Sequence, residues 1–532
     1  MKTFIKILLL TLMMMPAIAI AHDFEVDGIF YKKNNNNTTV TVTYRGNDIW
    51  VYSNEYSGDI NIPSTVNYEG TTYSVISIDS YAFYDCFEVT SINIPNSVSS
   101  IGEAAFYRCI RLTSINIPNS VTSIKKSTFY DCIGLTNVNI PNSVKTIGYK
   151  AFNGCTGLIS VNLPDSIISI GGSAFYGCTG LTSITIPISV NTMGNNAFAN
   201  CTALKTVYFN AEHCSYTTGE NEMFVWGVFG GSQIDNLFIG NSVNSLPNYF
   251  AAGISSMENI TIPDNVKSIG EYAFQNCIGL KNVIIPNSIT SLNSCMFSGC
   301  TALTNVNIPN SVNKICGGAF YECSSLENVT IPNSVTVIGG SAFYDCTSLS
   351  NISIPNSVTT IYGSAFEGCS NLKNVEIPES VTELGNSIFQ NCSGLENVVI
   401  GGGVTTIPKN TFNNCRNLTK VFLPYSLRYI EDDAFYFCEK LDQVVCKAIT
   451  PPTIKNYNCF YPGYYMATLY VPKRSVEAYK ANDKWCNFLN IVGFENEDDV
   501  PNDSDYMKCD TNGDGEVNIS DVNKVIDAIL NH

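Results

Sequence analysis

Oxygen-bearing side chains recur at a fixed spacing close to the end of the 532-residue chain. In a twelve-residue loop that starts at Asp510, positions 1, 3, 5, 9 and 12 are Asp or Asn, and Gly515 stands at position 6, where the turn is sharp. A calcium ion takes six to eight hard oxygen ligands, and the main-chain carbonyl at position 7 adds to such a set. The spacing therefore predicts a Ca²⁺ site formed by Asp510, Asn512, Asp514, Glu516, Asn518 and Asp521.

An apolar stripe follows this loop and predicts a helix with one apolar face, since the stripe has the spacing i, i+3, i+4, i+7 and i+8: Val522, Val525, Ile526, Ile529 and Leu530. A calcium loop followed by one helix resembles one half of a type I dockerin. The resemblance implies a calcium-dependent attachment motif over residues 509–532, with a cohesin-like module as its partner. Dockerins usually have two such segments and often Ser-Thr at loop positions 10 and 11, whereas this chain has one segment and Ile519-Ser520. The alternative interpretation is a disordered acidic tail.

Fourteen of the 21 cysteines occupy one position of an internal repeat. Stacked repeats would place their thiols in a column with a spacing of roughly 5 Å. One interpretation is metal storage or a redox relay, and the other is a set of small buried side chains that donate weak hydrogen bonds to turns. Cys295 and Cys316 lie outside this set, in neighbouring repeats, and are candidates for a disulfide. We call the set of fourteen the cysteine row: Cys86, Cys109, Cys132, Cys155, Cys178, Cys201, Cys277, Cys300, Cys323, Cys346, Cys369, Cys392, Cys415 and Cys438.

Catalytic chemistry finds little support, because the chain has only three histidines, His22, His213 and His532. His213 lies between Glu212 and Cys214, which would allow a Cys-His pair. The alternative is a solvated loop histidine, since adjacent loop residues rarely form a nucleophile and its base. We therefore expect no enzyme and assign no catalytic or cofactor-binding residue.

Binding is better supported by the residues that should point outward from a short recurring strand. In successive repeats this outward column is mostly Asn and Thr, but it changes to Tyr208 and Phe238. An insertion near residues 212–231 lies between them and carries Phe224 and Trp226. Tyr, Ser and Asn are typical of adaptable binding surfaces, and an insertion in a regular array often marks the binding face. We predict Tyr208, Phe224, Trp226 and Phe238 as ligand-binding residues; the alternative is a solvated ladder in which single aromatic side chains shield the backbone.

A second row, of tyrosines that directly follow a repeated Phe, has the same two interpretations. Its members are Tyr84, Tyr107, Tyr130, Tyr176, Tyr321, Tyr344 and Tyr436.

All of these positions are set by a repeat of 23 residues. Residues 332–354 read PNSVTVIGGSAFYDCTSLSNISI, and one such unit cannot bury its own apolar side. A repeat of this length predicts a solenoid whose stacked coils share one core and whose strands pair in parallel. Within a coil we expect a short strand at Leu-x-x-Ile-x-Ile, a second extended piece at residues 335–338, one helical or 3₁₀ turn at residues 340–345, and Phe343 as the large core residue. Similar units begin at Pro95, Pro118, Pro141, Pro164, Pro187, Pro263, Pro286, Pro309 and Pro355.

Composition divides the chain into six expected parts. Lys2, Lys6, an apolar run over residues 7–15 and Ala19-Ile20-Ala21 indicate a signal peptide over residues 1–21. Residues 22–62 alternate with period two and should form an N-terminal cap of antiparallel strands. The repeats cover residues 63–447, followed by C-terminal cap coils at 448–492, an acidic linker at 493–508 and the calcium motif. The net charge of −17 disfavours nucleic acid and anionic membranes as partners, and no later apolar run is long enough to span a bilayer.

The pattern IPNSVxxIGxxAFxxCxxLxxIxIP is similar to that of the BspA-like leucine-rich-repeat proteins, over roughly residues 24–492. Residues 447–452, 469–472 and 485–488 look like the last coils of that family. The resemblance implies a β-rich, right-handed leucine-rich-repeat solenoid. It also implies a secreted or cell-surface protein that acts as an adhesin and binds host or extracellular proteins. An alternative function is a non-catalytic, carbohydrate-binding component of a polysaccharide-degrading assembly.

Overall fold

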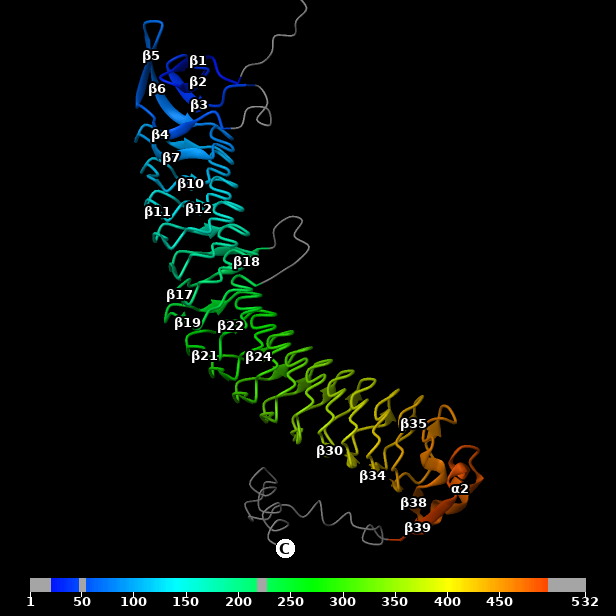
Figure 1. Cartoon of the computed structure of the whole chain (residues 1–532). Coiled ribbons are helices and arrows are strands. Elements are labelled where there is room, and N and C mark those ends of the chain that lie inside the picture. Colours follow the sequence, from blue (N-terminus) through cyan, green and yellow to red (C-terminus); the bar gives the residue numbers. More distant parts are fainter. Residues whose placement is uncertain (1–20, 47–53, 218–226, 496–532) are drawn as a thin grey trace, which may run out of the picture. The chain divides into compact units, whose positions relative to one another are not determined.

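The computed structural model describes residues 21–46, 54–217 and 227–495 (Figure 1). The chain divides into two compact units, residues 1–312 and residues 313–532. Each unit consists of short strands and turns that recur coil by coil, and strands of successive coils pair in parallel. The predicted β-rich solenoid with parallel sheets is therefore confirmed. The calcium motif and residues 1–20 of the expected signal peptide lie outside the described residues.

The first unit begins with a sheet in which antiparallel strands lead into the solenoid. Its strand order is β1-β2-β3-β6-β5, and β6 also pairs with β8. The β1–β2, β2–β3 and β5–β6 pairs are antiparallel, whereas the β3–β6 and β6–β8 pairs are parallel. The bounds are β1 Phe24–Val26, β2 Ile29–Lys33, β3 Thr39–Thr43, β5 Thr65–Tyr68, β6 Thr71–Ile78 and β8 Ser100–Ile101.

In each unit the Leu-x-x-Ile-x-Ile segments form a column of strands, which we call the sheet column of that unit. In the first unit these are β4 Ser57–Asn61, β7 Glu88–Asn93, β9 Ser114–Ile115, β11 Asn137–Asn139, β13 Ser160–Asn162, β15 Ser183–Ile186, β17 Thr206–Phe209, β19 Asn236–Ile239, β21 Asn259–Thr261, β23 Asn282–Ile284 and β25 Asn305–Asn307. In the second unit they are β27 Asn328–Thr330, β30 Asn374–Ile377, β32 Asn397–Ile400, β34 Lys420–Leu423, β36 Gln443–Cys446, β38 Thr468–Pro472 and β39 Asn490–Phe494.

A second column of mostly two-residue strands runs beside it, as predicted for residues 335–338. In the first unit it comprises β8 and β10 Ser123–Ile124, β12 Thr146–Ile147, β14 Ser169–Ile170, β16 Thr192–Gly194, β18 Ser215–Thr217, β20 Ser245–Leu246, β22 Ser268–Ile269 and β24 Ser291–Leu292. In the second unit it comprises β26 Lys314–Ile315, β28 Val337–Ile338, β29 Thr360–Ile361, β31 Glu383–Leu384, β33 Thr406–Ile407, β35 Tyr429–Ile430 and β37 Thr453–Ile454.

The core of each coil contains the apolar positions of the repeat. Val335, Ile338, Phe343 and Leu349 are all fully buried. The repeated Phe rings stack on one another, with neighbouring centroids 4.9–5.7 Å apart from Phe83 to Phe229 in the first unit. In the second unit the spacing is 4.8–5.5 Å from Phe320 to Phe460. Every coil thus depends on its neighbours to cover both faces of one ring.

Residues 340–345 and the equivalent residues of the other coils form the third side of the coil as two consecutive turns. The prediction of a helical or 3₁₀ turn at this segment is wrong. Backbone N–H groups alternate there: Phe343 donates to Ala365 of the next coil at 2.8 Å, whereas Tyr344 donates back to Ser341 at 3.2 Å. Ser341 and Asp345 have φ of 54° and 53°. These left-handed residues interrupt a right-handed helix, and half of the donors instead connect neighbouring coils.

The last coils carry the only helices among the described residues. They are η1 Gly463–Tyr465, η2 Lys473–Ser475, α2 Val476–Ala481 and η3 Trp485–Asn487. Trp485 is fully buried, its ring centroid lies 5.8 Å from that of Phe460, and its Nε1 donates to the carbonyl of Pro452 at 2.7 Å. The indole therefore covers the last ring of the Phe stack in the second unit.

Candidate binding surface

Tyr208 and Phe238 lie where the sequence pattern predicts, side by side on the outer face of the sheet column. The parallel register pairs Thr185 with Tyr208 and Tyr208 with Phe238. The two rings are 45% and 50% exposed, and their centroids are 5.1 Å apart with an interplanar angle of 15°. Their neighbours in this column are mostly Asn and Thr in the first unit, where Ile284 is a further exposed apolar side chain.

The geometry of this pair determines what it offers to a ligand. Aromatic pairs prefer offset-stacked or edge-to-face arrangements with ring centroids about 4.5–7 Å apart. At 5.1 Å and 15° the rings of Tyr208 and Phe238 are stacked. Each ring therefore covers part of the other, and about half of each side chain stays exposed to solvent. Such a stacked pair offers an exposed apolar surface to a binding partner.

Parts of the insertion near residues 212–231 are integrated into the coil, whereas the predicted ligand-binding residues Phe224 and Trp226 lie outside the described residues. Residues 215–217 form β18 and pair with β16. Phe229 occupies the stacked Phe row, 5.7 Å from Phe198.

The Cys-His pair considered from the sequence is not assembled. The His213 side chain is exposed, and its Nε2 lies 3.6 Å from Glu212 Oε1. Cys214 is buried in the core, and burial raises the pKa of its thiol to about 12. A buried, protonated thiol beside an exposed imidazole is not a nucleophile–base pair.

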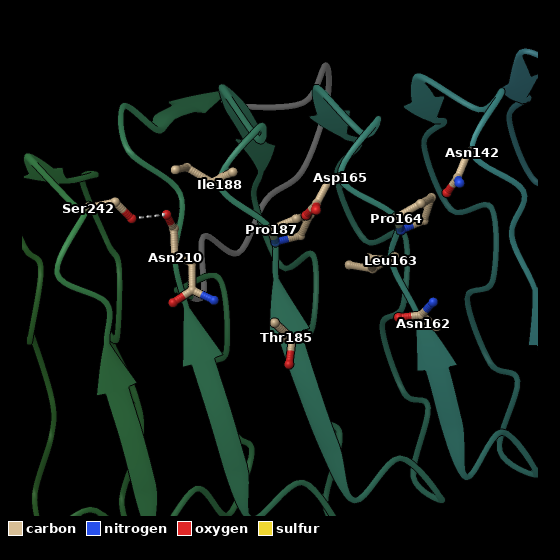
Figure 2. Close-up of a pocket in the computed structure, with 10 residues that line it drawn as sticks. All are labelled: Asn142, Asn162, Leu163, Pro164, Asp165, Thr185, Pro187, Ile188, Asn210 and Ser242. Carbon is tan, nitrogen blue, oxygen red and sulfur yellow. Dashed lines mark hydrogen bonds between the residues drawn. The ribbon is translucent and has the colours of Figure 1, made fainter.

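Beside the aromatic pair lies a groove with a volume of about 620 Å³, which the sequence pattern did not predict. Its floor is Leu163, Pro164 and Pro187, and all three are buried. The other lining residues are mainly polar, and they come from five successive coils (Figure 2). They are Asn142, Asn162, Asp165, Thr185, Ile188, Asn210 and Ser242.

The groove and the aromatic pair are continuous. Thr185 lines the groove, and in the parallel ladder it is the direct neighbour of Tyr208. Asn210 and Gly240 replace the repeated proline in two successive coils, and a Cβ on Gly240 would lie 2.4 Å from Asn210 Oδ1. The loss of proline at two consecutive copies is the sequence signal that could have located this groove.

The tyrosine row packs as a ladder. Tyr107 stacks on Tyr84 and on Tyr130, with centroid distances of 4.9 and 4.6 Å, and Tyr321 stacks on Tyr344 at 4.8 Å. The three tyrosines of the first stack are half-buried, and burial raises the pKa of Tyr107. This packing favours the structural interpretation of the row.

The cysteine row also has a structural role. The Sγ of Cys346 donates to the carbonyl of Phe320 at 3.2 Å, and Cys109, Cys178 and Cys415 repeat this contact with the Phe 26 residues earlier. Burial raises the pKa of these thiols, for instance that of Cys201 to about 12. The described residues contain no cluster of three or more His, Cys, Asp or Glu side chains suited to a metal ion. A buried thiol donor fits these observations, and the pairing of Cys295 with Cys316 stays a prediction.

The second unit has an outward apolar strip that the sequence reasoning missed. In the register of β30, β32, β34, β36 and β38, Glu376, Val399, Phe422, Val445 and Tyr470 are neighbours. Phe422 and Val445 are buried although they point away from the core, because their neighbours and Phe494 pack over them. Burial raises the pKa of Glu376 at the start of the strip. Following the outward column beyond Asn307 would have revealed it.

Comparison with known proteins identifies the repeat. The family model of the BspA type leucine rich repeat region matches residues 76–205, 122–250, 222–350 and 336–463. A leucine-rich repeat protein from Bacteroides ovatus is 26% identical, with 89% of this chain and 100% of that chain covered and a TM-score of 0.38. A leucine rich cell surface protein from Faecalibacterium prausnitzii is 30% identical, with 62% and 93% covered and a TM-score of 0.37.

No curated protein matches the chain. Among the described residues, no helix is long and apolar enough to cross a membrane. The family match spans most of the chain and coincides with the coils described above. The chain therefore belongs to the BspA-type leucine-rich repeat family.

Proposed function

We propose that this protein is a non-catalytic binding protein of the cell surface or the secreted fraction. It recognises an extracellular macromolecule, such as a host protein, through the sheet column around Tyr208 and Phe238. The proposal is supported by the predicted signal peptide over residues 1–21 and by the F. prausnitzii relative, which is described as a cell surface protein.

The observation that carries the proposal is the exposure of this aromatic pair. Tyr208 and Phe238 expose about half of their surface and stand together on one face. Ile284 is a further exposed apolar side chain in the same outward column. Aromatic side chains are enriched among the residues that dominate protein interfaces, and a rigid stacked pair loses little conformational entropy when it binds.

We expect the double variant Tyr208→Ser/Phe238→Ser to lose affinity for its partner at least tenfold, because two central aromatic contacts would be removed. The measurement is biolayer interferometry of the mature chain against immobilised collagen, laminin and fibronectin. Tyr362→Ser, which removes an exposed tyrosine of the second unit, is the matched control. Equal affinity of both variants would show that the aromatic pair is not the binding site.

The C-terminal motif is proposed as a calcium-dependent attachment segment. Its donor set of Asp and Asn side chains, with a main-chain carbonyl, has the hard oxygen chemistry that Ca²⁺ prefers. A cohesin-like module is the proposed partner, by resemblance to dockerins.

Isothermal titration of the mature chain with CaCl₂ should reveal one site with a Kd between about micromolar and millimolar. Asp510→Asn/Asp514→Asn should abolish that heat, since both carboxylates are ligands, whereas Ser520→Ala at a non-ligand position of the loop should retain it. Absence of a calcium signal in the unmodified chain would refute the motif.

A further inference from the structure

We infer that the groove next to the aromatic pair binds a neutral glycan, so that the macromolecule recognised by this face is a polysaccharide or a glycosylated protein. The inference rests on the proposed function and names the chemical class of its ligand. It depends on the polar lining of the groove rather than on Tyr208 and Phe238.

The polar side chains of the groove have unused hydrogen-bonding capacity. No hydrogen bond within the described residues uses the side-chain oxygen or nitrogen atoms of Asn142, Asn162, Asp165, Thr185 or Asn210. Some asparagines elsewhere on the sheet column bond to one another instead. Amide ladders join Asn93 to Asn61, Asn282 to Asn259 and Asn397 to Asn374 at 2.8–2.9 Å. The groove therefore concentrates donors and acceptors that the protein leaves available.

The strand pairing is interrupted where these side chains gather. β13 belongs to the sheet β11-β13, and β15 belongs to the separate sheet β15-β17-β19. Asn162 ends β13 on one side of the interruption, and Thr185 stands on β15 on the other. Figure 2 shows Asn162 and Thr185 on adjacent strands below Pro164 and Pro187. Polar side chains from two coils therefore line the same groove as these two prolines.

The charge and shape of the lining select among ligand classes. Asp165 is its single charged side chain, and it contains no lysine, arginine or histidine. A carboxylate without a counter-cation repels phosphate, sulfate and uronate groups. The amide groups of the lining donate and accept hydrogen bonds and the Asp165 carboxylate accepts them, so these planar groups match adjacent hydroxyls of a sugar. The proline rings and Leu163 match the C–H face of a sugar ring. A volume of about 620 Å³ lies within the range of about 300–1,000 Å³ that is common for small-ligand sites.

Affinity electrophoresis of the mature chain in gels that contain neutral polysaccharides tests the inference. We use β-glucan, mannan, galactomannan and arabinoxylan as neutral probes, and heparin and polygalacturonate as anionic ones. We expect retardation by at least one neutral probe and by neither anionic probe. Asn162→Ala/Asp165→Ala should weaken that binding about tenfold or more, because two sets of hydrogen bonds are lost. Asn307→Ala, at the same strand position three coils beyond Phe238, should leave it unchanged.

A second arm separates this inference from the proposed function. Immobilised collagen, laminin and fibronectin are presented before and after enzymatic removal of their glycans. Binding that disappears on deglycosylation and in Asn162→Ala/Asp165→Ala supports the inference. Binding that persists on deglycosylated protein, with no neutral probe retained, overturns the glycan while the proposed function stands. Retardation by neutral probes that is unchanged in Asn162→Ala/Asp165→Ala overturns the groove as the site. All variants replace exposed side chains, and circular dichroism confirms that they fold.

Discussion

Replacing Phe343 by Ala should lower the free energy of unfolding by about 3–5 kcal/mol, the usual cost of removing a buried phenylalanine. Phe343 is fully buried and stacks on Phe320 and Phe366 with centroid distances of 5.3 Å on both sides. The truncation removes the ring that separates two other rings, and the backbone ladders on three sides of the coil limit how far the coil can collapse. Urea denaturation followed by circular dichroism measures the loss.

The spatial pattern of that loss is as informative as its size. Because coils contact mainly their sequence neighbours, hydrogen exchange should accelerate first in the coils next to Phe343. Tyr362→Ala is the control, because this tyrosine is 52% exposed and lies one coil away, and its removal should cost less than about 0.5 kcal/mol. Equal effects of the two substitutions would contradict the role of the Phe stack.

Replacing Trp485 by Ala should cost a similar amount, about 3–5 kcal/mol, for a different reason. Trp485 closes the stack at Phe460, and Tyr479 packs against the indole in a T-shaped contact at 5.2 Å. Without the indole, the last coil of the second unit would expose its core. Thermal unfolding of the mature chain should therefore begin at a lower temperature, with early loss of structure in the last coils.

Trp485→Phe separates the two contributions of this side chain. Phenylalanine keeps much of the apolar cover and loses the hydrogen bond from Nε1 to the carbonyl of Pro452. A loss of about 1–3 kcal/mol is expected, because the carbonyl acceptor remains buried. A larger loss for Trp485→Phe than for Trp485→Ala would contradict the assignment of Trp485 as an apolar cover.

The repeat made the architecture predictable because one coil determines all of its copies. The apolar positions of residues 332–354 specify which side chains face the core, and the 23-residue spacing places the equivalent side chains at the same position in the next coil. The orientation of Tyr208 and Phe238 followed from the two-residue period of a strand. The burial of the thiols followed from the tendency of free cysteine to lie in the core.

The remaining features depend on contacts between coils that no single copy encodes. The left-handed backbone at Ser341 is imposed by bonds to the next coil, and Ser carries no local signal for it. The groove needs Asn162, Thr185 and Asn210 from three coils at one corner, and each residue type is common throughout the chain. Val445 is buried on the outer face only because Phe422, Tyr470 and Phe494 gather there.

The alternation of backbone donors on the turn side has a consequence for how such a chain can change over generations. The backbone N–H groups of Phe129, Phe152 and Phe175 each donate to the residue 22 positions later, at 2.7–2.8 Å, so the hydrogen bonds between coils are the same from one coil to the next. Removing or duplicating a whole coil would leave matching donors and acceptors on both sides of the junction. Recombination between near-identical stretches of the gene can thus change the number of coils. The coils that start at Asn210 and Gly240 depart from the repeat, and exchanging them would remove part of the groove.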